Sequence, residues 1–136
     1  MAILALTNAK VLVNSVDLSA YCKDLTLEFD AADLDATAMS STGWTAHIGG
    51  LKSGKFDATF NQDYAASAVD ATLFAALGTV VAVTVNPVNA ANSATNPQYQ
   101  FNVLVTQVPG PTGKVGDIVE AKVSWPITGA VVRAIV

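Results

Sequence analysis

The sequence predicts a mainly β fold, an antiparallel β-sandwich or half-open barrel with one short α-helix on its flank. Three observations support this fold class. Apolar and polar residues alternate with a period of two in several segments, one segment has helical spacing instead, and turn-forming residues separate the segments. A chain of 136 residues is long enough to bury a core of its own. We therefore expect a single domain over residues 1–136.

The first expected element is a short hairpin near the start of the chain. An apolar strand, 11–13, reaches the two-residue turn Asn14-Ser15, and the chain then leaves toward Asp17-Leu18-Ser19. The following strand, 24–30, alternates strictly between Leu or Phe and polar residues. Strands joined by such short turns are typical of an antiparallel sheet.

Four more segments alternate in the same way, and each is predicted to be a half-buried strand: 56–60, 81–85, 101–105 and 119–125. Trp125 ends the last of these and is predicted to lie in the core. Cys22 is the only cysteine, so the chain can form neither an internal disulfide nor a cysteine-based metal cage. We expect Cys22 to be a small hydrophobic group in the core.

One segment, about 68–77, is predicted to be the helix. Ser67 and Asp70 resemble a capping box with Asp in place of Glu. Four apolar residues then follow at helical spacing, and Gly78 supplies a left-handed stop: Val69, Leu73, Phe74 and Leu77 form the expected apolar set. A helix this short is marginal alone, so it must pack on the sheet.

Residues from about 31 to 50 are predicted to form a long loop. Such a loop in a compact domain is usually functional or disordered. Its spaced apolar residues are candidates for contacts between subunits: Leu34, Met39, Trp44 and Ile48. Acidic residues beside and within its start are candidates for a loop that docks on a neighbouring subunit: Asp30, Asp33 and Asp35. We expect the loop to be flexible in the free subunit and ordered in an assembly.

Charged residues make up only 13% of the chain, against about 25% in an ordinary soluble protein. We infer that neighbouring copies cover much of the surface, although a β-domain made soluble by Ser, Thr and Asn is the alternative. The net charge is −4, and the seven Lys and Arg residues are scattered. This distribution argues against nucleic-acid binding. The most apolar stretch, 71–85, is too short and interrupted to cross a membrane, so no membrane partner is expected.

Two local motifs suggest ligand sites and fail on inspection. Residues 49–55 have the glycine and lysine spacing of a phosphate-binding loop, but Phe56 replaces the Ser or Thr that binds magnesium, and a strand follows where a helix is needed. Asp33 could begin a calcium loop, but Ala38 stands at the turn glycine and Trp44 at the closing Glu. We expect no cofactor and no metal.

No catalytic set is apparent either. His47 is the only histidine, and no Ser or Cys with an orienting carboxylate is grouped with it in the local sequence. Pairs of acidic residues could hydrolyse sugars in principle, but here they occupy the polar positions of alternating strands. We predict that the protein is not an enzyme.

The opening hairpin, its Asn14-Ser15 turn before Asp17-Leu18-Ser19 and the long strand that follows resemble the major tail-tube proteins of long-tailed bacteriophages. The resemblance implies hexameric rings that stack into a tube with other tail proteins, a location in the virion tail and assembly in the host cytoplasm. It also makes the apolar residues of the 31–50 loop candidates for contacts between rings, and Asp30, Asp33 and Asp35 candidates for the wall of the lumen. Genomic DNA would pass through the tube without specific binding. Two alternatives stay open, a trimeric capsid decoration protein and, from another class, a carbohydrate-binding β-sandwich.

Overall fold

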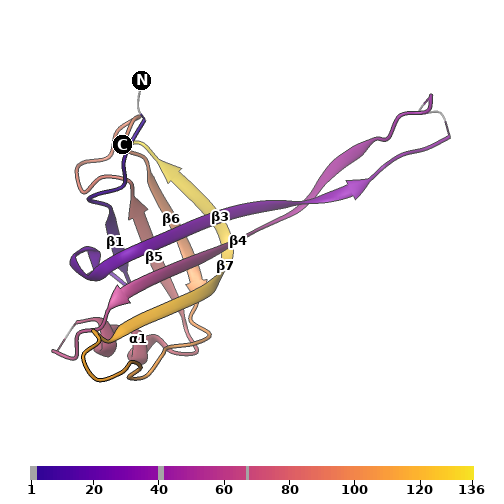
Figure 1. The fold of residues 1–136 in the computed structure, drawn as a ribbon. Helices are drawn as coiled ribbons and strands as arrows, with labels where there is room; N and C mark the ends of the chain where they lie inside the picture. Colours follow the sequence, from indigo (N-terminus) through magenta and orange to yellow (C-terminus); the bar gives the residue numbers. More distant parts are fainter. Residues whose placement is uncertain (1–2, 40–41, 67) are drawn as a thin grey trace.

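The computed structural model describes residues 3–39, 42–66 and 68–136, and it contains seven strands in one antiparallel sheet with the order β2-β1-β5-β6-β7-β4-β3. Figure 1 shows the arrangement. The expected mainly β, half-open fold with one short α-helix is confirmed. The elements are β1 (Lys10–Val13), β2 (Val16–Asp17), the 3-10 turn η1 (Ser19–Tyr21), β3 (Cys22–Asp35), β4 (His47–Asn61), α1 (Val69–Ala76), β5 (Val80–Asn86), β6 (Gln98–Leu104) and β7 (Glu120–Ala134).

The sheet folds over on itself because β7 changes partner halfway along its length. Its first half pairs with β4, ending at Lys55↔Pro126, and its second half pairs with β6, beginning at Val103↔Ile127. The strands β3 and β4 therefore cross in front of β1, β5 and β6 (Figure 1). Among the described residues, β2 and β3 remain as the two edges, so the sheet does not close into a barrel.

The hydrophobic core fills the space between these two layers. The Phe56 ring lies 5.7 Å from the Phe101 ring of the facing layer and 6.1 Å from the Trp125 ring. Trp125 is fully buried, as predicted, and its Nε1–H donates to the Gln107 carbonyl at 2.9 Å. Cys22 differs from its prediction, because it is only half-buried and packs against the margin of the core. That partial burial raises the pKa of its thiol.

The N-terminal hairpin forms as predicted. Asn14 and Ser15 both have positive φ angles, 50° and 66°, which is the backbone conformation of the two-residue turns that match the twist of a hairpin. Residues Val13 and Val16 pair on either side of this turn.

Helix α1 begins and ends within the predicted range, but its buried face differs from the expected one. Val69 and Leu73 are buried, whereas Phe74 and Leu77 are exposed. The buried residues instead follow a spacing of three and four residues, which places them on one face of the helix: Val69, Thr72, Leu73 and Ala76. Phe74 lies about 100° around the helix from Leu73, and Leu77 is already past the last helical residue.

The two ends of α1 are held differently. The proposed capping residue Ser67 lies outside the described residues, and the N-cap position is Ala68, which makes no side-chain cap hydrogen bond. At the other end, Gly78 has φ 82°, as expected of a left-handed stop, and its N–H donates to the Val105 carbonyl at 2.8 Å. The helix is thereby tied to the chain that follows β6.

The predicted long loop at 31–50 is wrong. Strand β3 continues through Asp35 and β4 begins at His47, so the two form one long hairpin and only residues 36–46 lie between them. The part of this hairpin over residues 30–53, here called the arm, extends away from the rest of the molecule (Figure 1). Strand β7 is also longer than predicted and reaches Ala134. In both cases the strand continues where burial, and with it the regular alternation, is lost.

Candidate interaction surface

The arm has no third strand to support it. The last residue of β4 that pairs with β7 is Lys55, and beyond it β4 pairs with β3 alone. A two-stranded ribbon in water is marginally stable by itself. The arm buries little of its own apolar surface, so most of its side chains are exposed to solvent or available to a partner.

All four predicted contact candidates lie on this arm, and all four are exposed: Leu34, Met39, Trp44 and Ile48. Trp44 has 79% of its surface accessible and Met39 is fully accessible. Leu34 and Ile48 are directly opposite each other on the two strands, so they form one apolar pair across the ribbon. Grouped exposed apolar side chains of this kind mark interaction surfaces.

The face of β3 that is apolar in the body, meaning the molecule without the arm, becomes acidic in the arm, and the opposite face becomes apolar. In the body, Leu25 and Leu27 pack against the core. Every second residue further along leads to Asp33 and Asp35, so the continuation of the apolar face is acidic. Leu34 belongs to the other face. A register shift between Ala31 and Asp33, where β4 contains an extra residue, accompanies this change.

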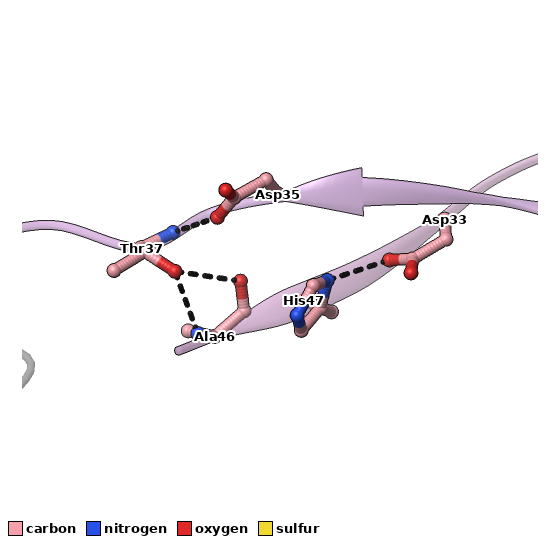
Figure 2. A network of polar contacts seen from close by, with 5 residues as sticks. All are labelled: Asp33, Asp35, Thr37, Ala46 and His47. Atoms are coloured by element: carbon pink, nitrogen blue, oxygen red, sulfur yellow. Dashed lines mark hydrogen bonds and ion pairs between the residues drawn. The ribbon is translucent and has the colours of Figure 1, made fainter. Parts of the chain in front are cut away.

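A network of polar contacts holds the outer end of the arm together (Figure 2). The Asp33 Oδ1 lies 2.8 Å from His47 Nδ1, which joins the two strands. The Thr37 N–H donates to Asp35 Oδ1 at 2.8 Å, and the Ala46 N–H donates to Thr37 Oγ1 at 2.8 Å. Hydrogen bonding to Thr37 lowers the pKa of Asp35. These side chains take over where the regular strand pairing ends.

The three acidic candidates are not brought together. Asp33 and Asp35 share one face of β3, while Asp30 belongs to the other. Within the described parts of the chain, no group of three His, Cys, Asp or Glu residues is placed to hold a metal ion. The acidic positions therefore act separately, two on the arm and one at its base.

The base of the arm contains a groove of about 630 Å³ that the sequence did not indicate, here called the basal groove. It opens because β4 and β7 diverge once their pairing ends at Lys55 and Pro126. Its lining combines apolar side chains with two cations and one carboxylate: Phe29, Asp30, Ala31, Lys52, Ser53, Gly54, Tyr99, Ile127, Gly129, Ala130, Val131 and Arg133.

Residues distant in the sequence meet at two points in the basal groove, one between two aromatic rings and one at Gly54. Phe29 and Tyr99 make a tilted ring contact at 5.8 Å across its inner end. Gly54 sits where a Cβ would lie 2.9 Å from Ile127 Cδ1 and 3.0 Å from the Glu28 carbonyl oxygen. A side chain there would displace the Ile127 side chain and crowd the Glu28 carbonyl, so glycine permits this close approach.

Lys52 and Arg133 are exposed, and neither forms an ion pair with any residue that the structure describes. Lys52 lies in the 49–55 segment whose phosphate-loop spacing fails, and Arg133 was not a candidate in the sequence. The two are distant in the chain and come to one groove only because β7 turns toward β6. No signal in the local sequence could have joined them.

Among the residues that the structure describes, no helix is long and apolar enough to cross a membrane.

No protein-family model matches the chain, and no curated protein sequence matches it significantly. Solved structures do match. A chain in the virion of a native gene transfer agent particle aligns with a TM-score of 0.74 and 15% identity, covering 97% of this chain and 99% of that one. A chain in the tail of an empty gene transfer agent particle, which has C6 symmetry, aligns with a TM-score of 0.61 and 18% identity, covering 84% and 82%. The protein thus shares its fold, over nearly its whole length, with a chain of a gene transfer agent particle.

Proposed function

We propose that this protein is a structural virion protein, the protomer of hexameric rings that stack into the tail tube of a phage-like particle. The observation that carries the proposal is the match to a chain in a C6-symmetric tail over most of both chains. The sequence resemblance to tail-tube proteins, which rests on the opening hairpin, points the same way. The role is assembly, with no catalysis and with no cofactor.

The unpaired edges of the sheet supply the means of ring formation. The outer edge of β3 is fourteen residues long and is unpaired among the described residues, while the opposite edge ends in the short strand β2. A long free edge is a template for pairing with another chain. In a closed ring, each copy covers the edge of its neighbour, and six copies leave no edge open.

The arm supplies contacts between rings. Its exposed apolar residues have no partner within the core, and ordering an extended segment costs about 1–2 kcal/mol per residue in backbone entropy. Contacts with another ring would offset that cost by covering Trp44, Met39 and the Leu34–Ile48 pair. The tube then grows by repetition of one contact, in the host cytoplasm where the virion tail is assembled.

The net charge suits a conduit for DNA. Six copies carry six times −4, or −24 formal charges, in each ring. Where this charge faces the lumen, it repels the phosphate backbone, so DNA slides without adhering to the wall. We expect no measurable binding of duplex DNA at physiological salt, because the seven Lys and Arg residues are scattered in the sequence and the basal groove brings together two of them, too few to release many phosphate counterions. A gel shift at micromolar protein that weakens with salt would contradict this.

Electron microscopy of the purified protein in negative stain tests the assembly. We expect rings with six-fold symmetry or hollow tubes, and mass photometry at micromolar concentration should show hexamers or larger species. Trimers alone would favour a capsid decoration protein, and a clean monomer under all salt conditions would favour a separate binding module such as a carbohydrate-binding β-sandwich. Either result would overturn the tail-tube proposal.

A further inference from the structure

We propose that the basal groove is the receptor for the arm of a second copy of this chain. The proposal rests on the tail-tube function above and names the surface that the arm contacts. Each copy then offers one arm and one groove, which are different surfaces. Such a contact is head-to-tail, and where its rotation does not close into a ring it repeats from one ring to the next and extends a stack.

Charge complementarity identifies the occupant. Lys52 and Arg133 give the basal groove two positive charges against the single negative charge of Asp30. From Asp33 to His47 the arm contains two carboxylates and no Lys or Arg. An acidic face therefore meets a cationic groove, which steers association and fixes the register of docking.

The apolar parts of the two surfaces also correspond. The basal groove exposes Phe29 and has Ile127 and Val131 half-buried along its wall. The arm offers Trp44 at its outer end. The Leu34–Ile48 pair lies on the face opposite Asp33 and Asp35, so it stays available for contacts outside the groove when the acidic face meets it. Aromatic and aliphatic side chains that enter a pocket are the usual anchors of an interface, with charged residues at the rim.

The occupant must come from another copy. The arm is a continuous ribbon directed away from the body (Figure 1), so it cannot fold back into the groove at its own base. At about 3.3 Å per residue, the start of β4 at His47 lies roughly 17 Å along the strand from Lys52, and Trp44 lies beyond it. The N-terminal segment of a neighbour, with Ile3, Leu4 and Leu6 exposed, is the competing occupant, but residues 3–9 carry no charged side chain to meet Lys52 and Arg133.

Cross-linking between singly labelled copies tests the proposal. Cys22→Ala removes the only native thiol, and two populations then carry Ala36→Cys on the arm or Ala130→Cys in the basal groove, which leaves every charged residue in place. Mixed, assembled and treated with a short bismaleimide, they should give a covalent dimer. Ala71→Cys, exposed on α1 outside the groove, is the matched control and should give little product.

The outcomes separate this proposal from the proposed function. Rings or tubes that form without the 36–130 product, or that cross-link Ala130→Cys to Ala5→Cys instead, overturn the groove assignment while the tail-tube function stands. The absence of any assembly overturns both. Equal cross-linking of the Ala71→Cys control also overturns the assignment, because it shows that the reaction is not site-selective.

Charge reversal provides an independent measurement. Lys52→Glu with Arg133→Glu should raise the protein concentration needed for tube growth about tenfold or more, because like charges then face each other. Adding Asp33→Lys and Asp35→Lys to the same chain should restore much of the loss. Lys114→Glu with Lys122→Glu makes the same change in net charge outside the groove and should have little effect. Equal effects of the two double reversals would contradict the proposal.

Discussion

Strands β3 and β4 run through both the arm and the body, which is the rest of the molecule, yet only the body has a hydrophobic core. Along β4, Phe56 and Phe60 are fully buried between the two layers. Farther out on the same hairpin, Ile48 and Trp44 are exposed. The difference comes from β7, which pairs with β4 only as far as Lys55 and then turns to β6. Apolar residues in the body therefore stabilise the fold, and apolar residues on the arm are available to a partner.

The largest expected effect compares the two tryptophans. Trp125→Ala should lower the free energy of unfolding by about 3–5 kcal/mol, because it removes a fully buried ring and leaves the Gln107 carbonyl without its donor. Trp44→Ala should change it by less than about 0.5 kcal/mol, because its side chain is exposed. Urea denaturation of the unassembled subunit measures both. A large loss in Trp44→Ala would mean that the arm belongs to the folding core.

The helix offers a comparison within a single element. Leu73→Ala should cost about 2–5 kcal/mol, because Leu73 is fully buried. Phe74→Ala removes a larger side chain from the next position, which is exposed, and should cost far less. Thermal unfolding of the two variants beside the parent protein measures the difference. Equal melting temperatures of the two variants would mean that Leu73 is not on the face of α1 that packs in the core.

Hydrogen exchange should distinguish the arm from the body in the free subunit. Amides between 31 and 50 are expected to exchange faster than those of residues 56–60, because the arm has neither packing nor a third strand. In the assembled state, the arm amides should slow while those of the body change little. Equal protection of the arm in both states would contradict its role as an assembly contact.

The smallest expected effect concerns acid. The Lys23 ammonium, 2.7 Å from Glu120, lowers the pKa of that carboxyl, so the unfolded chain binds its proton more readily than the folded one. The stabilisation from the ionised Glu120 carboxylate is present above pH 4.5, the ordinary pKa of glutamate, and is lost as the pH falls below that pKa. Glu120→Gln should therefore flatten the decline of the urea midpoint below that pH.

Asp35→Asn is the matched control for this acid effect, since the pKa of Asp35 is also lowered but its partner Thr37 lies on the arm. We expect this variant to leave the acid dependence of global unfolding unchanged. If both variants flattened it equally, the arm would unfold together with the body.

Sequence pattern alone determined the strands that have one buried and one exposed face. The alternation at 24–30, 56–60, 81–85, 101–105 and 119–125 predicted β3 to β7 at their buried parts, because each side chain there must point either into the core or into water. The Asn14-Ser15 turn was equally readable, since its two residues adopt positive φ angles with short polar side chains. The exposed ends of the strands carried no such pattern.

Tertiary structure alone decided the arm and the basal groove. Residues 31–35 and 47–54 are strands because they pair with each other, and a ribbon exposed on both faces imposes no regular alternation on its sequence. The partner change at Pro126 then brings Arg133 into the same groove as Lys52, although 80 residues separate them in the chain. The residue pattern of one strand indicates which of its side chains are buried. The groove between β4 and β7 depends instead on β7 leaving β4 to pair with β6, which no single strand's pattern indicates.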